Sequence, residues 1–333
     1  MRKVDFIIFF LLFTITLSGQ NIQSSKWNLE NNSNSIYKGL SNTKITYKGG
    51  LVLEANDKDK FGGLSALWVS NDGKKIVAIS DYSSKQNFNT ENRSRWFLFD
   101  LYYDENQNLI NADINKKGQF LDFEKKVISG EIESLAWNHN TLYISFDEGN
   151  KLFSYDINCI RSGEKLCTPI GTFELDNFPK RHNAGIEALT LTRENHLLAI
   201  YEKNTGQESR EAWLLNPVTG STKNIIYIAS LEDIKGATTL QNGDILILEK
   251  TYDDKTIFRL SLVAKDSLNK QTIETDEIFT SPKSKALDNF EGIASYSKNG
   301  KEYLFIISDD NGDRNKDQKT LLFHFELNLN KTK

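Results

Sequence analysis

A repeated hairpin pattern restricts the fold of this 333-residue chain more than any other feature. Each copy consists of a short strand of β-branched and aromatic residues, a polar turn such as Asn242-Gly243, and a second apolar strand. The copies begin near Gly63, Glu133, Glu187, Gly236 and Glu291. Three successive intervals are about 50 residues, slightly longer than a usual propeller blade. Short strands at such even spacing favour a β-propeller.

We therefore predict an all-β fold, a single β-propeller with six blades, of which five are clearly readable. The sixth would use extra strands at 95–103 and 119–128, or the pairing of "KITYKGGLVLEA" near the N-terminus with the C-terminal "TLLFHFEL". A β-sandwich is the alternative, although it does not explain the repetition. The propeller is expected over residues 43–327, with a C-terminal tail at 328–333.

The N-terminus predicts export. Basic residues precede an apolar stretch from Phe6 to Leu17, and small residues follow it. This pattern predicts a signal peptide at 1–19 and a loose leader at 20–42, with a periplasmic or secreted mature protein. The alternative is an uncleaved anchor, but the apolar stretch is shorter than the roughly 20 residues that span a membrane. No stable span is expected after cleavage.

The two cysteines, Cys159 and Cys167, lie close together in "NCIRSGEKLC". In an oxidising compartment this spacing would close a short loop, and we predict a disulfide between them. The alternative is two separate buried thiols. A zinc site is not expected, because no histidine or further cysteine lies nearby.

Acidic residues recur at the open end of each predicted hairpin. Those at the start of the first strand are Glu133, Glu187 and Glu291, and those at the end of the second strand are Asp81, Asp147, Glu202, Glu249 and Asp309. Opposite residues of an antiparallel pair lie about 5 Å apart, and blades surround one axis, so the acids should converge. Clustered carboxylate oxygens suit Ca²⁺, and we predict that these residues hold it.

The alternative is that each acid is bonded separately, to a backbone amide or to a basic neighbour. Lys203, Lys250 and Arg259 are candidate partners for such pairs. The segment "SDDNGDRNKDQ" superficially suggests a calcium loop, but its glycine and terminal acid do not fit an EF-hand. We interpret it as a solvated loop.

The sequence resembles the exported "esterase-like activity of phytase" family over nearly the whole mature chain. The matching segments, in order, are "FGGLSAL", "ESLAW", "ISFDE", "NAGIEAL", "LLAIYE", "NGDILILEK", "DNFEGIA", "ISDDN" and "QKTLLFHFEL". The resemblance implies an exported propeller that hydrolyses phosphate or other esters with Ca²⁺. The chain has "SDYS" and "QKT" where the family tends to have Ser-Asp-Arg-Gly and Gln-Arg-Thr, so two arginines suited to clamping phosphate are missing.

The first functional hypothesis is a Ca²⁺-dependent hydrolase of small-molecule phosphoric or carboxylic esters. The candidate catalytic residues are Glu187, Glu291, Asp310 and His182. The candidate substrate-binding residues are Arg93, Arg95, Arg181 and Lys250.

Two alternatives stay open. One is a non-catalytic propeller that binds a ligand or an envelope partner and uses calcium structurally. The other is a hydrolase of another kind, such as a lactonase, with one divalent ion. The net charge of −4 argues against a nucleic-acid partner, and we expect a monomer.

Overall fold

The computed structural model describes residues 22–27, 34–55, 61–82, 93–147, 149–179, 185–202, 208–253, 255–311 and 318–329. The predicted signal peptide lies outside these residues. Within the predicted leader, Ile22–Lys26 forms strand β1 and Asn34–Gly39 forms helix α1. No helix of the described residues is long and apolar enough to cross a membrane.

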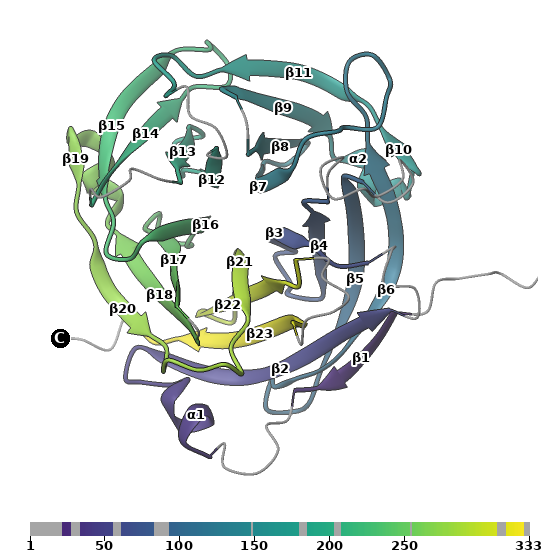
Figure 1. Ribbon diagram of the computed structural model, residues 1–333, viewed down its shortest axis with the longest axis vertical. Helices are drawn as coiled ribbons and strands as arrows, with labels where there is room; N and C mark the ends of the chain where they lie inside the picture. The colour runs from purple at the N-terminus through teal and green to yellow at the C-terminus, as the bar shows by residue number, and fades with distance from the viewer. Residues whose placement is uncertain are drawn as a thin grey trace, which may run out of the picture.

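The described strands form five sheets arranged as blades around a common axis (Figure 1). Blade 1 contains β3 (Leu64–Val69), β4 (Lys75–Ser80), β5 (Arg95–Tyr103) and β6 (Leu109–Phe120), with β10 (Leu166–Cys167) at its outer edge. Blade 2 contains β7 (Ile132–Trp137), β8 (Thr141–Phe146), β9 (Lys151–Asp156) and β11 (Pro169–Glu174). In each blade the first strand lies nearest the axis.

The other three blades follow the same order outward from the axis. Blade 3 contains β12 (Ile186–Leu191), β13 (Leu197–Tyr201), β14 (Ser209–Leu215), β15 (Thr222–Ile228) and β19 (Thr272–Ile273). Blade 4 contains β16 (Asp233–Thr239), β17 (Ile245–Asp253), β18 (Lys255–Val263) and β20 (Asp276–Thr280). Blade 5 contains β21 (Asn289–Lys298), β22 (Lys301–Asp309), β23 (Thr320–Leu327), β2 (Ile45–Ala55) and β1.

The predicted propeller is confirmed, but the number of blades is five rather than six. Both sets of strands considered for a sixth blade complete other blades instead. Strand β5 is the third strand of blade 1, but the strand predicted at 119–128 is wrong: the fourth strand is β6, which ends at Phe120, and residues 121–128 form a turn closed by an isolated bridge between Leu121 and Val127. Strand β2 pairs with β23, with Leu51 opposite Leu322, and so joins the two ends of the chain within blade 5.

Most blade strands are apolar on both faces because each blade packs between two others. In β22, for example, every residue from Tyr303 to Asp309 is buried. One buried cluster joins Leu67 of blade 1 to Phe305 of blade 5, and so closes the circle of blades. This two-sided burial explains why the strands appear in the sequence as apolar runs rather than as alternating patterns.

The predicted disulfide between Cys159 and Cys167 is present. It joins helix α2 (Asn158–Ser162), which follows β9 of blade 2, to β10, which pairs with β6 of blade 1. The bond therefore ties neighbouring blades together.

Replacing both cysteines by serine is expected to lower the free energy of unfolding by about 2–3 kcal/mol, because the short loop gains freedom in the unfolded chain. Urea unfolding of the double variant and of the oxidised wild type measures this difference. Reduced wild type is the matched control and should behave like the variant. Equal stability of all three forms would contradict the expectation.

Candidate functional site

The innermost strand of every blade is bulged at the same place. The pairing register shifts after the first residue of the strand in blades 1 to 3 and after the second residue in blades 4 and 5. A bulge inserts an extra residue and changes the direction of its side chain. The bulged residues, which we call the inner ring, are Ser65, Glu133, Glu187, Lys235 and Glu291, and all are buried.

A second set of residues stands at or near the end of the second strand of each blade. We call these residues, Asp81, Asp147, Glu202, Lys250 and Asp309, the outer ring. In blades 1 to 3 the backbone N–H of the outer-ring residue donates to a carbonyl just before the inner strand. In blades 4 and 5 the outer-ring residue pairs with the first residue of that strand. The expected convergence of acids from different blades is therefore present.

The lysines of blade 4 neutralise part of this acidic group. The Lys235 Nζ atom lies 3.1 Å from Glu202 Oε1, 3.2 Å from Glu187 Oε2 and 3.7 Å from Glu291 Oε1. The Lys250 Nζ atom lies 3.3 Å from Glu291 Oε1 and also donates to Asn289 Oδ1. Blade 4 thus has a cation in both rings where most other blades have acids.

Glu249 does not join the other predicted acids. It pairs with Ile234, one residue before Lys250 in the strand, so its side chain points to the other face of the blade. Its carboxylate accepts hydrogen bonds from Tyr227 Oη at 2.5 Å, Ser230 N at 2.9 Å and Leu231 N at 2.7 Å. These contacts leave Glu249 as a structural acceptor between blades 3 and 4.

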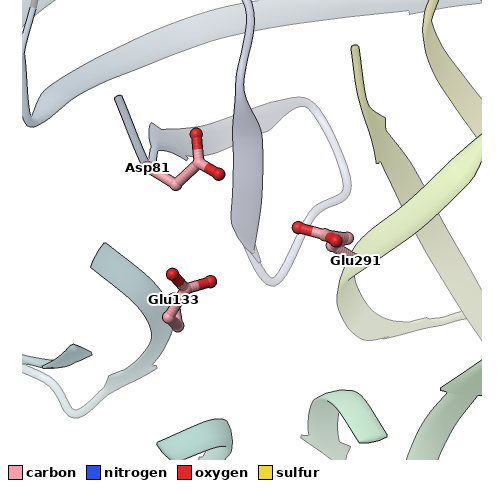
Figure 2. A group of neighbouring side chains, drawn as sticks. All are labelled: Asp81, Glu133 and Glu291. Atoms are coloured by element: carbon pink, nitrogen blue, oxygen red, sulfur yellow. The ribbon is translucent and has the colours of Figure 1, made fainter. Parts of the chain in front are cut away.

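Five of the acids lie in two groups that could hold a metal. One oxygen from each of Asp81, Glu133 and Glu291 lies within 4.8 Å of the others, and Figure 2 shows the three side chains approaching one another from three separate elements. Glu131, Glu133 and Asp147 form a second group of the same size. Glu133 belongs to both groups.

The Asp81 carboxylate gives the best test of whether a cation fits. Its Oδ1 atom is buried and has no hydrogen-bond partner in the described part of the chain. A buried carboxylate oxygen without a partner is costly, and a divalent cation would supply the missing contact. The oxygen-only donor set of Asp81, Glu133 and Glu291 suits Ca²⁺.

The pKa values follow from the uneven distribution of cations. Burial, together with neighbouring acids, raises the pKa of Asp81, Glu133 and Asp309 well above the usual range of each. Burial also raises the pKa of Glu187, although Lys235 opposes it. The pKa of Glu291 is lowered, because Lys235 and Lys250 outweigh the effect of its burial. A divalent cation beside Asp81 and Glu133 would favour their charged forms.

Asp310 and its neighbours form the edge of the site in blades 1 and 5. Its carboxylate accepts hydrogen bonds from Gly63 N at 2.8 Å, Tyr82 Oη at 3.3 Å and Thr320 Oγ1 at 3.3 Å. The bond to Gly63 brings this acid next to the segment that precedes the inner ring of blade 1. Asp310 therefore links the "FGGLSAL" and "QKT" segments in space.

The predicted substrate-binding cations are distributed differently. Arg181 and His182 lie outside the described residues. Arg95 begins β5 and Arg93 lies just before it, at the end of blade 1 where β4 runs into Asp81. Lys250 is buried in the outer ring, paired with Glu291.

Sequence reasoning missed Lys235, which is the main cation of the site. The signal was present: "IKGA" in blade 4 occupies the place of "IEAL" in blade 3 and "FEGI" in blade 5. A search for repeated acids passes over a position at which one blade has a lysine. Glu131 and Asn289, which also contact or adjoin the site acids, were missed because the search considered only the acids that recur at equivalent positions of the hairpins.

A family model described as phytase-like, esterase-like activity of phytase, matches residues 59–312. The chain belongs to this phytase-like family. The match covers the inner and outer rings of all five blades, so the rings lie in the phytase-like region. Comparison with curated proteins gave no match.

Several solved structures are similar to the phytase-like chain at low identity. Myxococcus xanthus glutaminyl cyclase is 11% identical with a TM-score of 0.46, over 80% of this chain and 91% of that one. The Malassezia sympodialis allergen Mala s 1 is 14% identical with a TM-score of 0.45, over 84% and 87%. The PQQ-bound aldose sugar dehydrogenase of Streptomyces coelicolor is 11% identical with a TM-score of 0.46, over 80% and 95%. At these values we draw no functional conclusion from the three proteins.

Proposed function

We propose that this phytase-like protein is an exported, Ca²⁺-dependent hydrolase of small phosphoric or carboxylic esters. The observation that carries the proposal is the Asp81, Glu133 and Glu291 group, with ligand oxygens within 4.8 Å and a buried, unpartnered Asp81 oxygen. Membership of a family described by esterase-like activity supports the reaction class. The disulfide is compatible with an oxidising compartment.

In this proposal Asp81, Glu133 and Glu291 hold the cation. Bound Ca²⁺ would polarise a phosphoryl or carbonyl oxygen and make a bound water more acidic. Asp309 and Asp147, next to these acids, complete the negative environment that attracts a divalent ion. Lys235 and Lys250 fix Glu291 from the opposite side through contacts of 3.7 and 3.3 Å.

Glu187 is our candidate proton acceptor. It lies on the blade next to Glu133, and its pKa is raised by burial, which makes a carboxylate a better base near neutral pH. The contact with Lys235 at 3.2 Å holds its side chain in place. Arg93, Arg95 and Arg181 are proposed to contact an anionic substrate, with His182 and Asp310 as further candidates for proton transfer.

Ca²⁺ added to chelator-treated protein is expected to raise the melting temperature by several degrees, because it binds the folded site only. Asp81→Asn should lose most of this rise, since it removes one charge and one ligand. Asp113→Asn, which changes an exposed aspartate of blade 1, is the matched control and should respond like wild type. No rise in wild type, or an equal rise in Asp81→Asn, would contradict the metal site.

Turnover of p-nitrophenyl phosphate and p-nitrophenyl butyrate tests the reaction separately. We expect Ca²⁺-dependent hydrolysis of at least one ester, reduced by about 100-fold or more in Glu187→Gln while the fold persists. Exposed Glu174→Gln is the control, and it should keep full activity.

A non-catalytic propeller with structural calcium is the second candidate. The pairing of Glu187, Glu202 and Glu291 with Lys235 favours it, because three of the seven ring acids already have a lysine as a structural partner. It predicts that chelation lowers the melting temperature while neither ester is hydrolysed.

A further inference from the structure

A large cavity lies at the opposite end of the inner strands from the carboxylates. Its volume is about 690 Å³, and its wall includes Trp68 and Ser70 from the end of β3 and Trp137 to His139 from the end of β7. The inner ring occupies the start of the same strands. At about 3.3 Å per residue, Ser65 and Ser70 are separated by roughly 16 Å along the strand. The cavity is therefore separate from the proposed metal site.

Two tryptophans form the apolar part of this wall. Trp68 and Trp137 stack on each other with ring centroids 4.0 Å apart and an interplanar angle of 13°, and each is half-buried. This spacing leaves no room for an aromatic ring to insert between them, so a ligand can only pack on an outer face or edge of the pair. The apolar C–H face of a sugar ring suits such a flat surface.

Four asparagine amides and the Ser70 hydroxyl form half of the polar wall. Asn71, Asn115, Asn138 and Asn195 all line the cavity. Each amide both donates and accepts hydrogen bonds, as sugar hydroxyls do. An indole surface beside these amides therefore offers a sugar both apolar and hydrogen-bonding contacts.

The charged part of the wall is mainly cationic. Arg161, from helix α2, is exposed, and its guanidinium forms no ion pair within the described ranges. Lys116 lies beside it, with its Nζ atom 2.5 Å from the Arg161 carbonyl oxygen. Lys75 also lines the cavity and pairs with Asp100.

The acidic Asp72 lines the same cavity but is engaged in its own turn. Its Oδ1 atom accepts hydrogen bonds from Ser70 Oγ at 2.6 Å and from Lys74 N at 3.0 Å. The guanidinium of Arg161 is well shaped for a carboxylate, sulfate or phosphate group. Trp137, Arg161 and the amides together match the chemistry of a sugar that carries a negative charge.

We propose that this cavity binds an anionic oligosaccharide, with a sugar ring against the Trp68–Trp137 pair and its acidic group at Arg161 and Lys116. The disulfide helps to position Arg161, because Cys159 is two residues before Arg161 in α2 and its bond to β10 anchors that helix on blade 1. This site would be independent of the carboxylates and of any cation bound there.

Titration with trigalacturonate, followed by tryptophan fluorescence and calorimetry, tests the proposal. EDTA is present throughout, so that no metal at the carboxylates can contribute. We expect trigalacturonate to bind wild type at least ten-fold more tightly than neutral maltotriose or the non-sugar anion citrate. Arg161→Gln and Trp137→Leu should each weaken binding by ten-fold or more.

Lys151→Gln is the matched control. It removes an exposed charge at the other end of blade 2, where Lys151 pairs with Glu174, and should leave binding unchanged. Arg161 is exposed, so its variant stays informative even if Trp137→Leu unfolds. Absence of trigalacturonate binding, equal binding of citrate, or binding that persists in Arg161→Gln would overturn the proposal.

Discussion

Lys235→Met is expected to lower the free energy of unfolding at pH 7 by about 3–5 kcal/mol, the usual cost of removing one partner from a buried charged group. Lys235 contacts Glu187, Glu202 and Glu291, each within 3.7 Å, and all four side chains are buried. Methionine fills similar space but leaves the acids with less neutralising charge. The variant therefore isolates the charge of the lysine rather than its volume.

The pH dependence provides a further check on Lys235. The neighbouring acids raise its pKa well above 10.5, so its contribution is fully present at pH 7 and is lost only as the pH rises from about 10.5 through its folded-state pKa. In Lys235→Met the acids can take up protons as the pH falls, and the difference from wild type should narrow below pH 6. Urea unfolding of both proteins at several pH values measures this difference in the free energy of unfolding.

Lys301→Met is the matched control for this experiment. Lys301 pairs with Glu326 at 2.8 Å on the surface, and its loss should change stability little. Equal stability of the Lys235 and Lys301 variants at pH 7 would show that the buried lysine contributes no more to the free energy of unfolding than a surface lysine.

His324→Phe is expected to make the protein less sensitive to acid. Between pH 6.5 and 4 its free energy of unfolding should fall by about 3 kcal/mol less than that of wild type. His324 is fully buried in blade 5, where its ring stacks on Phe305 at 4.5 Å and Nδ1 has no partner in the described part of the chain. Burial and the charges of Lys48 and Lys298 lower the pKa of His324 to about 3. The folded protein therefore keeps this ring neutral.

The direction of the His324 effect follows from proton uptake. Below pH 6.5 the unfolded chain protonates this histidine while the folded protein does not, so stability is lost progressively down to the folded-state pKa. The buried acids with raised pKa act in the opposite direction, so only the difference between the two proteins isolates His324. Phenylalanine keeps the stacking but loses the 3.2 Å contact with Tyr296 Oη.

Urea unfolding of wild type and His324→Phe at half-unit steps from pH 7 to 4 measures the effect. His139→Phe changes an exposed histidine and is the control, with a pH profile expected to parallel that of wild type. Parallel profiles for all three proteins would show that His324 titrates normally in the folded state.

The sequence was sufficient to predict the blades because each blade is a local unit. The strand predicted at Arg95–Tyr103 has the same bounds as β5, and the turn at Asn299-Gly300 connects β21 to β22. Both features depend on apolar runs and turn residues close together in the chain. The disulfide was predictable for the same reason, since Cys159 and Cys167 are near neighbours in sequence.

The number of blades and the membership of the rings depend on contacts that local patterns do not contain. Strand β2 pairs with β23, which lies far from it in the sequence, to complete blade 5. No sequence periodicity indicates which blade β2 joins. Glu249 and Lys250 are adjacent in β17, so their side chains point to opposite faces of the blade. Lys235 occupies a position at which blades 2, 3 and 5 have a glutamate, so a search for recurring acids did not find it.

The junction of the chain ends in blade 5 has a consequence for biosynthesis. Strand β23 follows every strand of blades 1 to 4 in the sequence, so a growing chain can assemble those blades before blade 5 is complete. Until then the outer edge of β22 has no partner and can pair with another polypeptide. A premature stop before Thr320 should therefore yield aggregates rather than a smaller soluble product.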